Sequence, residues 1–151
     1  MKRNLVIVAV CGWIGALTST SSAHHSHLYT YDWCKTVAVE GRVESVQWKD
    51  PHTLIVVKPD DGGAVYIVDW MSLGGLTNNR LVAQAQAALV PGVRVAVTAA
   101  PIRSLAEIRE KFPDYNYEVN PRTLDPRSIR VADSFSWAVQ PGANPVDCKG
   151  K

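Results

Sequence analysis

The sequence predicts an all-β domain with one or two short helices, and three observations lead to this prediction. Apolar residues alternate with polar ones over segments of strand length, the first of them Val37 to Trp48. Turn signals such as Asp50-Pro51 and Pro59 to Gly63 separate these segments. Helical spacing of apolar residues is confined to Leu81 to Leu89 and Leu105 to Phe112.

The first three strands are expected to pair as an antiparallel meander. Val37 to Trp48 changes its apolar side after Val43, which requires a bulge or a bend, and nearby Gly41 would permit one. A long first strand that bends in this way is typical of small barrels. His52 to Lys58 is a nearly continuous apolar strand, and Ala64 to Trp70 is the third strand.

A helix follows the third strand. Its apolar face runs from Leu81 to Leu89, Thr77 or Asn78 is the expected cap, and Pro91-Gly92 ends it. Val93 to Ala99 then alternates as the fourth strand.

The connection to the fifth strand contains a second helix and a loop. Ser104 and Glu107 form a capping box that opens the helix, and Pro113 ends it. Asp114 to Pro126 predicts an aromatic, proline-rich loop, and Arg127 to Asp133 predicts the fifth strand, followed by a loose tail.

This order of elements is that of the OB fold, a five-stranded Greek-key barrel with a helix between its third and fourth strands. An open β-meander capped by helices is the alternative architecture. Either architecture forms one domain, expected to comprise residues 24–151.

Residues 1–23 have the layout of a cleavable export signal. A basic start precedes the apolar stretch Leu5 to Leu17, and small residues follow at Ser21 and Ala23, the third and first positions before the expected cut. The apolar stretch is shorter than the roughly 20 residues that a membrane span needs. We therefore expect cleavage after Ala23 and a periplasmic or secreted protein without stable membrane insertion.

Charge and cysteines agree with this interpretation. The chain has 16 Lys and Arg and 14 Asp and Glu residues, and removing Lys2 and Arg3 with the signal leaves a neutral domain. A neutral domain lacks the basic surface of a nucleic-acid-binding protein. Cys34 and Cys148 remain after cleavage, and in an oxidising compartment they predict a disulfide rather than two free thiols.

The chain carries a set of motifs in this order: Ala23-His24-His25-Ser26, Glu40-Gly41-x-Val43-x-x-Val46-x-Trp48-x-x-Pro51-His52, Asp61-Gly62, Trp70, Leu81 and Pro91-Gly92-x-x-Val95-x-Val97. This set resembles a family of small exported bacterial proteins known only as a domain of unknown function. The likeness runs from about Ala23 to Pro101. It implies an exported OB-like barrel and brings no established activity, substrate or cofactor.

The chain departs from this family in three places. Asp50 stands where the family usually has asparagine, and the pair Cys34 and Cys148 is not part of the pattern. Residues 102–125 form a long insertion where the family makes a short turn.

All four histidines lie early in the chain: His24, His25, His27 and His52. If cleavage follows Ala23, the α-amino group and imidazole of His24 would chelate Cu(II), and His27 or His52 would complete a T-shaped site. If Ala23 remains attached, His25 becomes the third residue, which binds Cu(II) through deprotonated amides. The alternative is that the tract is a solvated chain end and His52 only caps a turn.

Aromatic residues are the second group of candidates. In OB proteins, exposed aromatic side chains on the second and third strands can stack on bases or sugars. Tyr66 and Trp70 share a face with Val68, which predicts either core packing or a small hydrophobic ligand-binding groove.

The sequence contains no serine nucleophile elbow, phosphate-binding loop or metalloprotease helix. Asp32, Asp50 and Asp69 are expected to be turn or solvated-face residues. We therefore predict a non-enzymatic, exported binding domain whose ligand is a divalent metal, copper first. The competing hypothesis is an envelope interaction or structural module without metal.

Overall fold

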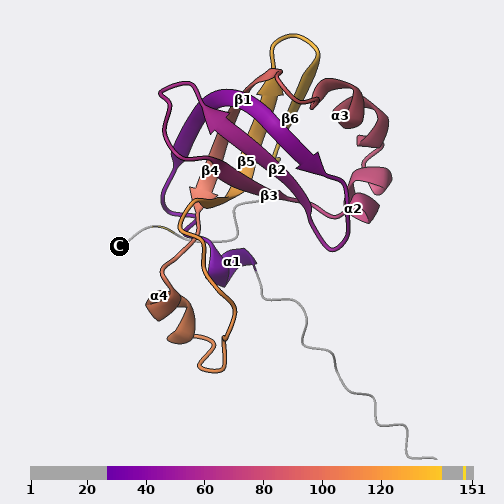
Figure 1. Cartoon of the computed structure of the whole chain (residues 1–151). Helices are drawn as coiled ribbons and strands as arrows, with labels where there is room; N and C mark the ends of the chain where they lie inside the picture. Colours follow the sequence, from indigo (N-terminus) through magenta and orange to yellow (C-terminus); the bar gives the residue numbers. More distant parts are fainter. Residues whose placement is uncertain (1–26, 141–147, 149–151) are drawn as a thin grey trace, which may run out of the picture.

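A closed β-barrel forms the body of the molecule, with two short helices below it (Figure 1). The computed structural model describes residues 27–140 and Cys148, so the expected signal lies outside the described residues. In chain order the elements are α1 (His27–Thr30), β1 (Val37–Gln47), β2 (Thr53–Pro59), β3 (Tyr66–Trp70), α2 (Leu73–Asn78), α3 (Val82–Ala88), β4 (Arg94–Pro101), α4 (Leu105–Arg109), β5 (Thr123–Val131) and β6 (Phe135–Ala138).

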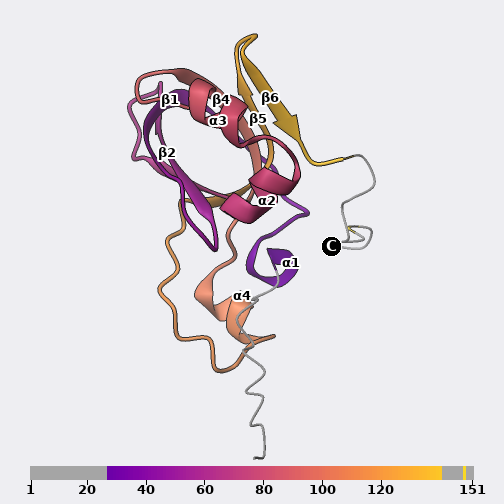
Figure 2. The same ribbon diagram turned by 90° about the vertical axis from the view of Figure 1, so that its right-hand side faces the viewer.

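The barrel closes between its third and fifth strands. Antiparallel pairing gives the order β3-β2-β1-β4-β5, and a short parallel pairing joins β3 to β5 at Ile67 and Val68. Figure 2 shows the resulting ring of strands, with α2 and α3 lying across one end. The predicted OB-like, five-stranded Greek-key barrel is confirmed, and the open meander is wrong because the sheet closes on itself.

Strand β1 bends and takes part in two sides of the barrel. It pairs with β4 from Val37 to Arg42 and with β2 from Gly41 to Gln47. The register with β2 shifts between Val43 and Ser45, so the predicted bulge is confirmed and lies just beyond Gly41. Gly41 itself permits close approach, because a Cβ there would meet the backbone of Lys58 and Pro59.

The core fills the interior of the barrel and the space beneath α2 and α3. Its residues come from the inward side of every barrel strand, from the two helices and from β6. The buried residues of this cluster are Val39, Val43, Ile55, Val57, Val68, Trp70, Leu76, Ala85, Ala88, Leu89, Val95, Val97, Ala99, Leu124, Ile129, Val131 and Phe135.

The segment between β3 and β4 differs from the single helix predicted. It forms two helices, and neither Thr77 nor Asn78 is the cap of α3, whose N-cap is Leu81. Ser72 is the N-cap of the extra helix α2, and its hydroxyl accepts a hydrogen bond from the Gly75 N–H at 2.9 Å. This cap and the complete burial of Leu76 stabilise α2. The sequence did not predict this helix because its two adjacent glycines have low helix propensity.

Residues 123–138 are also more regular than predicted. β5 begins at Thr123, inside the expected loop, and the register shift opposite Ala99 accommodates Pro126. The expected loose tail contains β6, which pairs with β5. Its aromatic residues pack on the indole ring of Trp70, with centroid distances of 6.0 Å for Phe135 and 5.3 Å for Trp137.

Replacement of Gly41 by alanine tests the close approach of β1 and β2. The added methyl group collides with backbone atoms that cannot rotate away, so we expect Gly41→Ala to lower the free energy of unfolding by about 1–3 kcal/mol. Gly74→Ala in α2 is the matched control, because its Cβ meets nothing nearer than the Ser72 hydroxyl at 3.8 Å. Urea unfolding measures both, and equal stability of Gly41→Ala and the unmodified protein would contradict the constraint.

Candidate functional site

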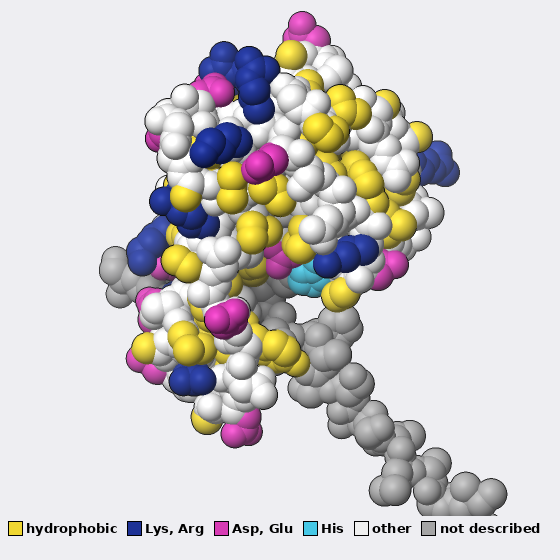
Figure 3. Space-filling view, viewed as in Figure 1, with side chains coloured by type: hydrophobic (Ala, Val, Ile, Leu, Met, Phe, Trp, Pro, Cys, Tyr) yellow, Lys and Arg dark blue, Asp and Glu magenta, His cyan; other side chains and the backbone are white. Residues whose placement is uncertain are grey.

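The Asp69 carboxylate of β3 joins the segment before β1 to the turn before β2. Its Oδ2 accepts a hydrogen bond of 2.6 Å from the Tyr31 hydroxyl, and its Oδ1 lies 2.5 Å from Nδ1 of His52. Asp69 can reach both because it lies beside Leu54 on the side of β3 that faces away from the core. Histidine and acidic atoms lie side by side on the lower edge of the barrel in Figure 3.

The three side chains differ in exposure, from 3% for Tyr31 to 15% for the Asp69 side chain and 35% for that of His52. Burial, and then the Asp69 carboxylate, raise the pKa of Tyr31 far above its usual value, so its phenol remains a donor. With the carboxylate against Nδ1, a neutral His52 holds its proton there and carries its lone pair on Nε2. Metal-ligating histidines are commonly held by a carboxylate in this way.

Residues 27–36, here called the lead-in, are fastened to the strands and to the chain beyond β4. The Asp32 N–H donates to the Pro101 carbonyl at 2.8 Å, and the Arg103 N–H donates to the Thr30 carbonyl at 2.9 Å. Tyr31 also forms a β-bridge with Ile102. The position of the Tyr31 ring therefore rests on backbone contacts as well as on Asp69.

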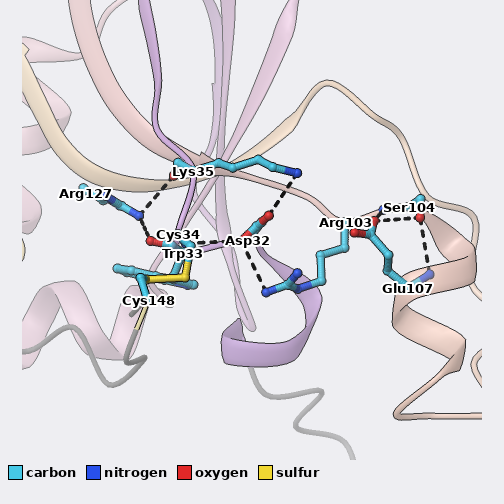
Figure 4. A network of polar contacts seen from close by, with 9 residues as sticks. All are labelled: Asp32, Trp33, Cys34, Lys35, Arg103, Ser104, Glu107, Arg127 and Cys148. Carbon is cyan, nitrogen blue, oxygen red and sulfur yellow. Dashed lines mark hydrogen bonds and ion pairs between the residues drawn. A yellow bond between two sulfur atoms is a disulfide. The ribbon is translucent and has the colours of Figure 1, made fainter. Parts of the chain in front are cut away.

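A second polar network surrounds Asp32 (Figure 4). Its carboxylate lies 3.1 Å from Nζ of Lys35 and 3.4 Å from Nη2 of Arg103, and it accepts a hydrogen bond from the Cys34 N–H. Burial alone would raise the pKa of Asp32. The hydrogen bonds from Lys35 and Cys34 and the charge of Arg103 outweigh burial and hold the pKa below its usual value.

Arg127 of β5 and a disulfide hold the end of the lead-in. The Arg127 guanidinium donates to the carbonyl groups of Trp33 and Lys35 and lies over the Trp33 ring. Cys34 is bonded to Cys148, which confirms the predicted disulfide. The two networks make the lead-in part of the folded domain.

The structure describes only two of the four predicted metal ligands, His27 and His52. His24 and His25 lie outside the described residues, His27 begins α1, and His52 is held by Asp69. Within residues 27–140 and Cys148, no three His, Cys, Asp or Glu side chains are placed to hold a metal ion. Metal binding by these histidines therefore stays a prediction.

The predicted ligand-binding pair divides between core and surface. Trp70 is 1% exposed and packs inside the barrel. Tyr66 is half-buried, and the Arg122 guanidinium lies 5.1 Å from its ring centroid. Core packing is thus the role observed for Trp70, and ligand binding by the pair stays a prediction.

Sequence reasoning missed the residue that orients His52. Asp32, Asp50 and Asp69 were expected to be turn or solvated-face residues. Asp32 does begin a turn, in which its carbonyl accepts a hydrogen bond of 2.9 Å from the Lys35 N–H, but Asp69 is largely buried and bonded. A signal for Asp69 exists, because a carboxylate between the core residues Val68 and Trp70 needs a partner. The identity of that partner depends on the strand register, which the sequence does not state.

Comparisons with known proteins concern the family and the fold. A family model described as a family of unknown function (DUF6152) matches residues 13–108. No curated protein shows significant sequence similarity to the chain. In the part of the chain that the structure describes, no helix is both long and apolar enough to span a bilayer.

A chain in the crystal structure of the S. pombe Stn1-ten1 complex resembles this one with a TM-score of 0.44 and 14% sequence identity. The match covers 70% of this chain and 66% of that chain, just under two thirds of its length. A likeness of this size carries no information about function.

The pH dependence of stability tests the ion pairs of Asp32. A lowered folded-state pKa stabilises the protein above the unfolded value of about 3.9, and this contribution is lost as the pH falls through the folded value. Asp32→Asn should therefore cost roughly 1–3 kcal/mol at pH 7 and progressively less below about pH 4. Urea unfolding against pH measures this, with the exposed Asp133→Asn as control. A cost independent of pH would refute the ionic contribution.

The disulfide should contribute strongly to stability. It closes a loop with a sequence separation of 114 residues, so the unfolded chain loses much conformational freedom. Cys34→Ser should lower the free energy of unfolding by about 2–5 kcal/mol. A reductant should destabilise the unmodified protein equally and leave Cys34→Ser unchanged in urea unfolding. An unmodified protein that is insensitive to reductant once its thiols are shown to be free would contradict this expectation.

Proposed function

The chain belongs to the family of unknown function DUF6152, and we propose that it is an exported, non-enzymatic domain that binds Cu(II). The proposed ligands are the N-terminal histidines and His52. The observation that carries the proposal is the Tyr31–Asp69–His52 contact, which links the histidine of the barrel to the segment that follows the histidine tract.

Export is supported by two independent features. The first is the signal-like segment 1–23 with small residues before His24. The second is the Cys34–Cys148 bond, because disulfides form and persist in oxidising compartments. Both features favour a periplasmic or secreted protein.

His52 has the surroundings of a prepared ligand. Asp69 orients the imidazole through Nδ1, and a metal would then bind at Nε2. The side chain is 35% exposed, which leaves part of it accessible from solvent. A carboxylate also raises the basicity of the imidazole that it supports, which strengthens binding to a cation.

Only a short stretch of chain separates the histidine tract from Tyr31, which bonds this carboxylate. Tyr31 bonds Asp69, and the chain from Tyr31 back to His27 is helical, with a rise of about 1.5 Å per residue. Residue 24 can lie at most about 25 Å along the chain from Tyr31, even when fully extended. A chain of this length would allow the tract to reach His52.

Cleavage after Ala23 would supply the remaining ligands. The new α-amino group and the imidazole of His24 form a chelate, and nitrogen ligands of this kind suit Cu(II). If Ala23 is retained, His25 takes the leading role through deprotonated backbone amides. Protons compete for the amine and the imidazoles, so affinity should fall below about pH 6.5.

A Cu(II) titration of the mature protein tests this function. The protein is exported, purified and sequenced at its N-terminus, then compared with a form that carries two extra N-terminal residues. We expect the extended form and His52→Ala to bind much more weakly, and Asp69→Asn to lose about 10–100-fold in affinity. Asp61→Asn, in the β2–β3 turn, is the matched carboxylate control.

Two outcomes would overturn the proposal. Equal affinity of the mature and extended forms would exclude the N-terminus as the site. An exported protein that retains Met1 would exclude the processed amine altogether. In either case the interaction module without metal becomes the better hypothesis.

A further inference from the structure

We propose that the outer edge of β6 pairs with β6 of a second copy of this chain, so that two barrels associate through one continuous sheet. This inference goes beyond the proposed function and does not depend on Cu(II). In the part of the chain that the structure describes, β6 is the last strand of the sheet and pairs only with β5. Figure 2 shows it on the outer side of β5, away from the ring of strands.

The pairing of β6 with β5 determines which backbone groups lie on the outer edge. The Val139 N–H donates to the Arg127 carbonyl at 2.8 Å, so it points toward β5. Because the direction of these groups alternates along an antiparallel strand, the N–H and C=O groups of Trp137 also point toward β5, while those of Ser136 and Ala138 point away. The outer edge therefore offers donors and acceptors to another strand.

The side chains of β6 leave this edge accessible. Natural proteins commonly keep strand edges from pairing by means of charged residues, proline or bulges. Strand β6 contains neither a charge nor a proline, and its register with β5 is regular. Its outward-pointing residues, Ser136 and Ala138, are small and exposed. An incoming strand can therefore reach the backbone.

The edge is complementary to itself. When two copies pair antiparallel about Trp137, Ser136 of each copy lies opposite Ala138 of the other. Each of these residue pairs exchanges two hydrogen bonds between N–H and carbonyl groups. This register uses every outward-pointing backbone group of β6, which is the reason to assign it.

The same register brings the two Trp137 rings together. In each copy Trp137 packs on Trp70 with 5.3 Å between ring centroids, and its side chain is half-buried. At the centre of the pairing it occupies a non-hydrogen-bonded position, where opposite side chains approach most closely. The two indole rings then cover each other, and aromatic cross-strand pairs of this kind stabilise a sheet.

Charge also favours a second copy over an unrelated strand. The full chain has a formal net charge of only +2, and removal of Lys2 and Arg3 would leave it neutral. Two neutral domains do not repel each other, whereas a large net charge would keep them apart. Beside β6, the exposed residues Arg130 and Asp133 carry opposite charges. Self-complementarity and neutrality together identify the occupant as another β6.

The test measures association of the mature, metal-free protein by analytical ultracentrifugation between about 10 µM and 1 mM, because a small interface gives a weak dimer. A chelator excludes association through a bridging metal. We expect a concentration-dependent equilibrium between monomer and dimer. Ala138→Pro should weaken dimerisation about tenfold or more, since proline removes the outward N–H without breaking a bond to β5.

Two lysine variants provide a matched comparison. Ala138→Lys places a charge on the outer edge and should also weaken dimerisation about tenfold or more. Ala106→Lys adds the same charge to an exposed alanine of α4 and should keep the association of the unmodified protein. Circular dichroism checks the fold of each variant. If Ala138→Pro does not fold, Ala138→Lys carries the test, because it keeps the backbone N–H.

Amide hydrogen exchange assigns the interface to individual residues. The N–H groups of Ser136 and Ala138 should exchange fast in dilute protein and slow down as the concentration rises. Those of Trp137 and Val139 should exchange slowly at every concentration, because they are bonded to β5 within each copy. Dimerisation through any other surface would not produce this alternation.

Three outcomes would overturn the inference. The first is a protein that stays monomeric over the whole concentration range. The second is a dimer that tolerates both Ala138 variants and leaves the Ser136 and Ala138 amides in fast exchange, because its interface then lies elsewhere. The third is slow exchange of these two amides in the dilute monomer, which would mean that another part of the same chain pairs with this edge.

Discussion

The rest of the site depends on the contacts that the Asp69 carboxylate makes with Tyr31 and His52. A largely buried carboxylate must be hydrogen-bonded, and Tyr31 and His52 supply its partners from two separate segments. One anion therefore determines both where the lead-in meets the barrel and how the imidazole is oriented. Burial and the Asp69 carboxylate raise the pKa of Tyr31, so its phenol stays protonated well beyond neutral pH and remains the donor in the link to the lead-in.

Closure of the barrel gives this contact its surroundings. The parallel pairing of β3 with β5 places Thr123 beside Ile67, so residues 102–122, the connection between β4 and β5, end close to the strand that carries Asp69. This connection begins after β4, which pairs with β1 immediately after the lead-in. Segments from three parts of the sequence thus converge at one end of the barrel. The Cys34–Cys148 bond holds Cys148 at the lead-in.

Local signals in the sequence predicted most of the barrel, and tertiary contacts account for what they missed. The parity change after Val43 predicted the bulge because side chains alternate along a strand, and Ser104 with Glu107 predicted a cap because both partners lie within one turn. β6 was missed because its four residues are too few to show a clear strand pattern. The first part of β5 was missed because it contains a proline, which is rare inside strands. His52 was a candidate metal ligand because the chain has few histidines. Its link to Asp69 and Tyr31 could not be predicted, because it depends on the register of the strands.

The arrangement of polar and apolar groups limits where a ligand can bind. The rings of Trp70 and Phe135 are buried in the core, so this barrel does not present them to a base or a sugar. The lower end instead combines a buried phenol, a carboxylate and a partly exposed imidazole beside the start of the described chain. If cleavage supplies the α-amino group, the proposed Cu(II) site would form only after export, in an oxidising compartment of the kind in which disulfides form. Processing would then prevent the protein from taking up metal before it reaches the place where it acts.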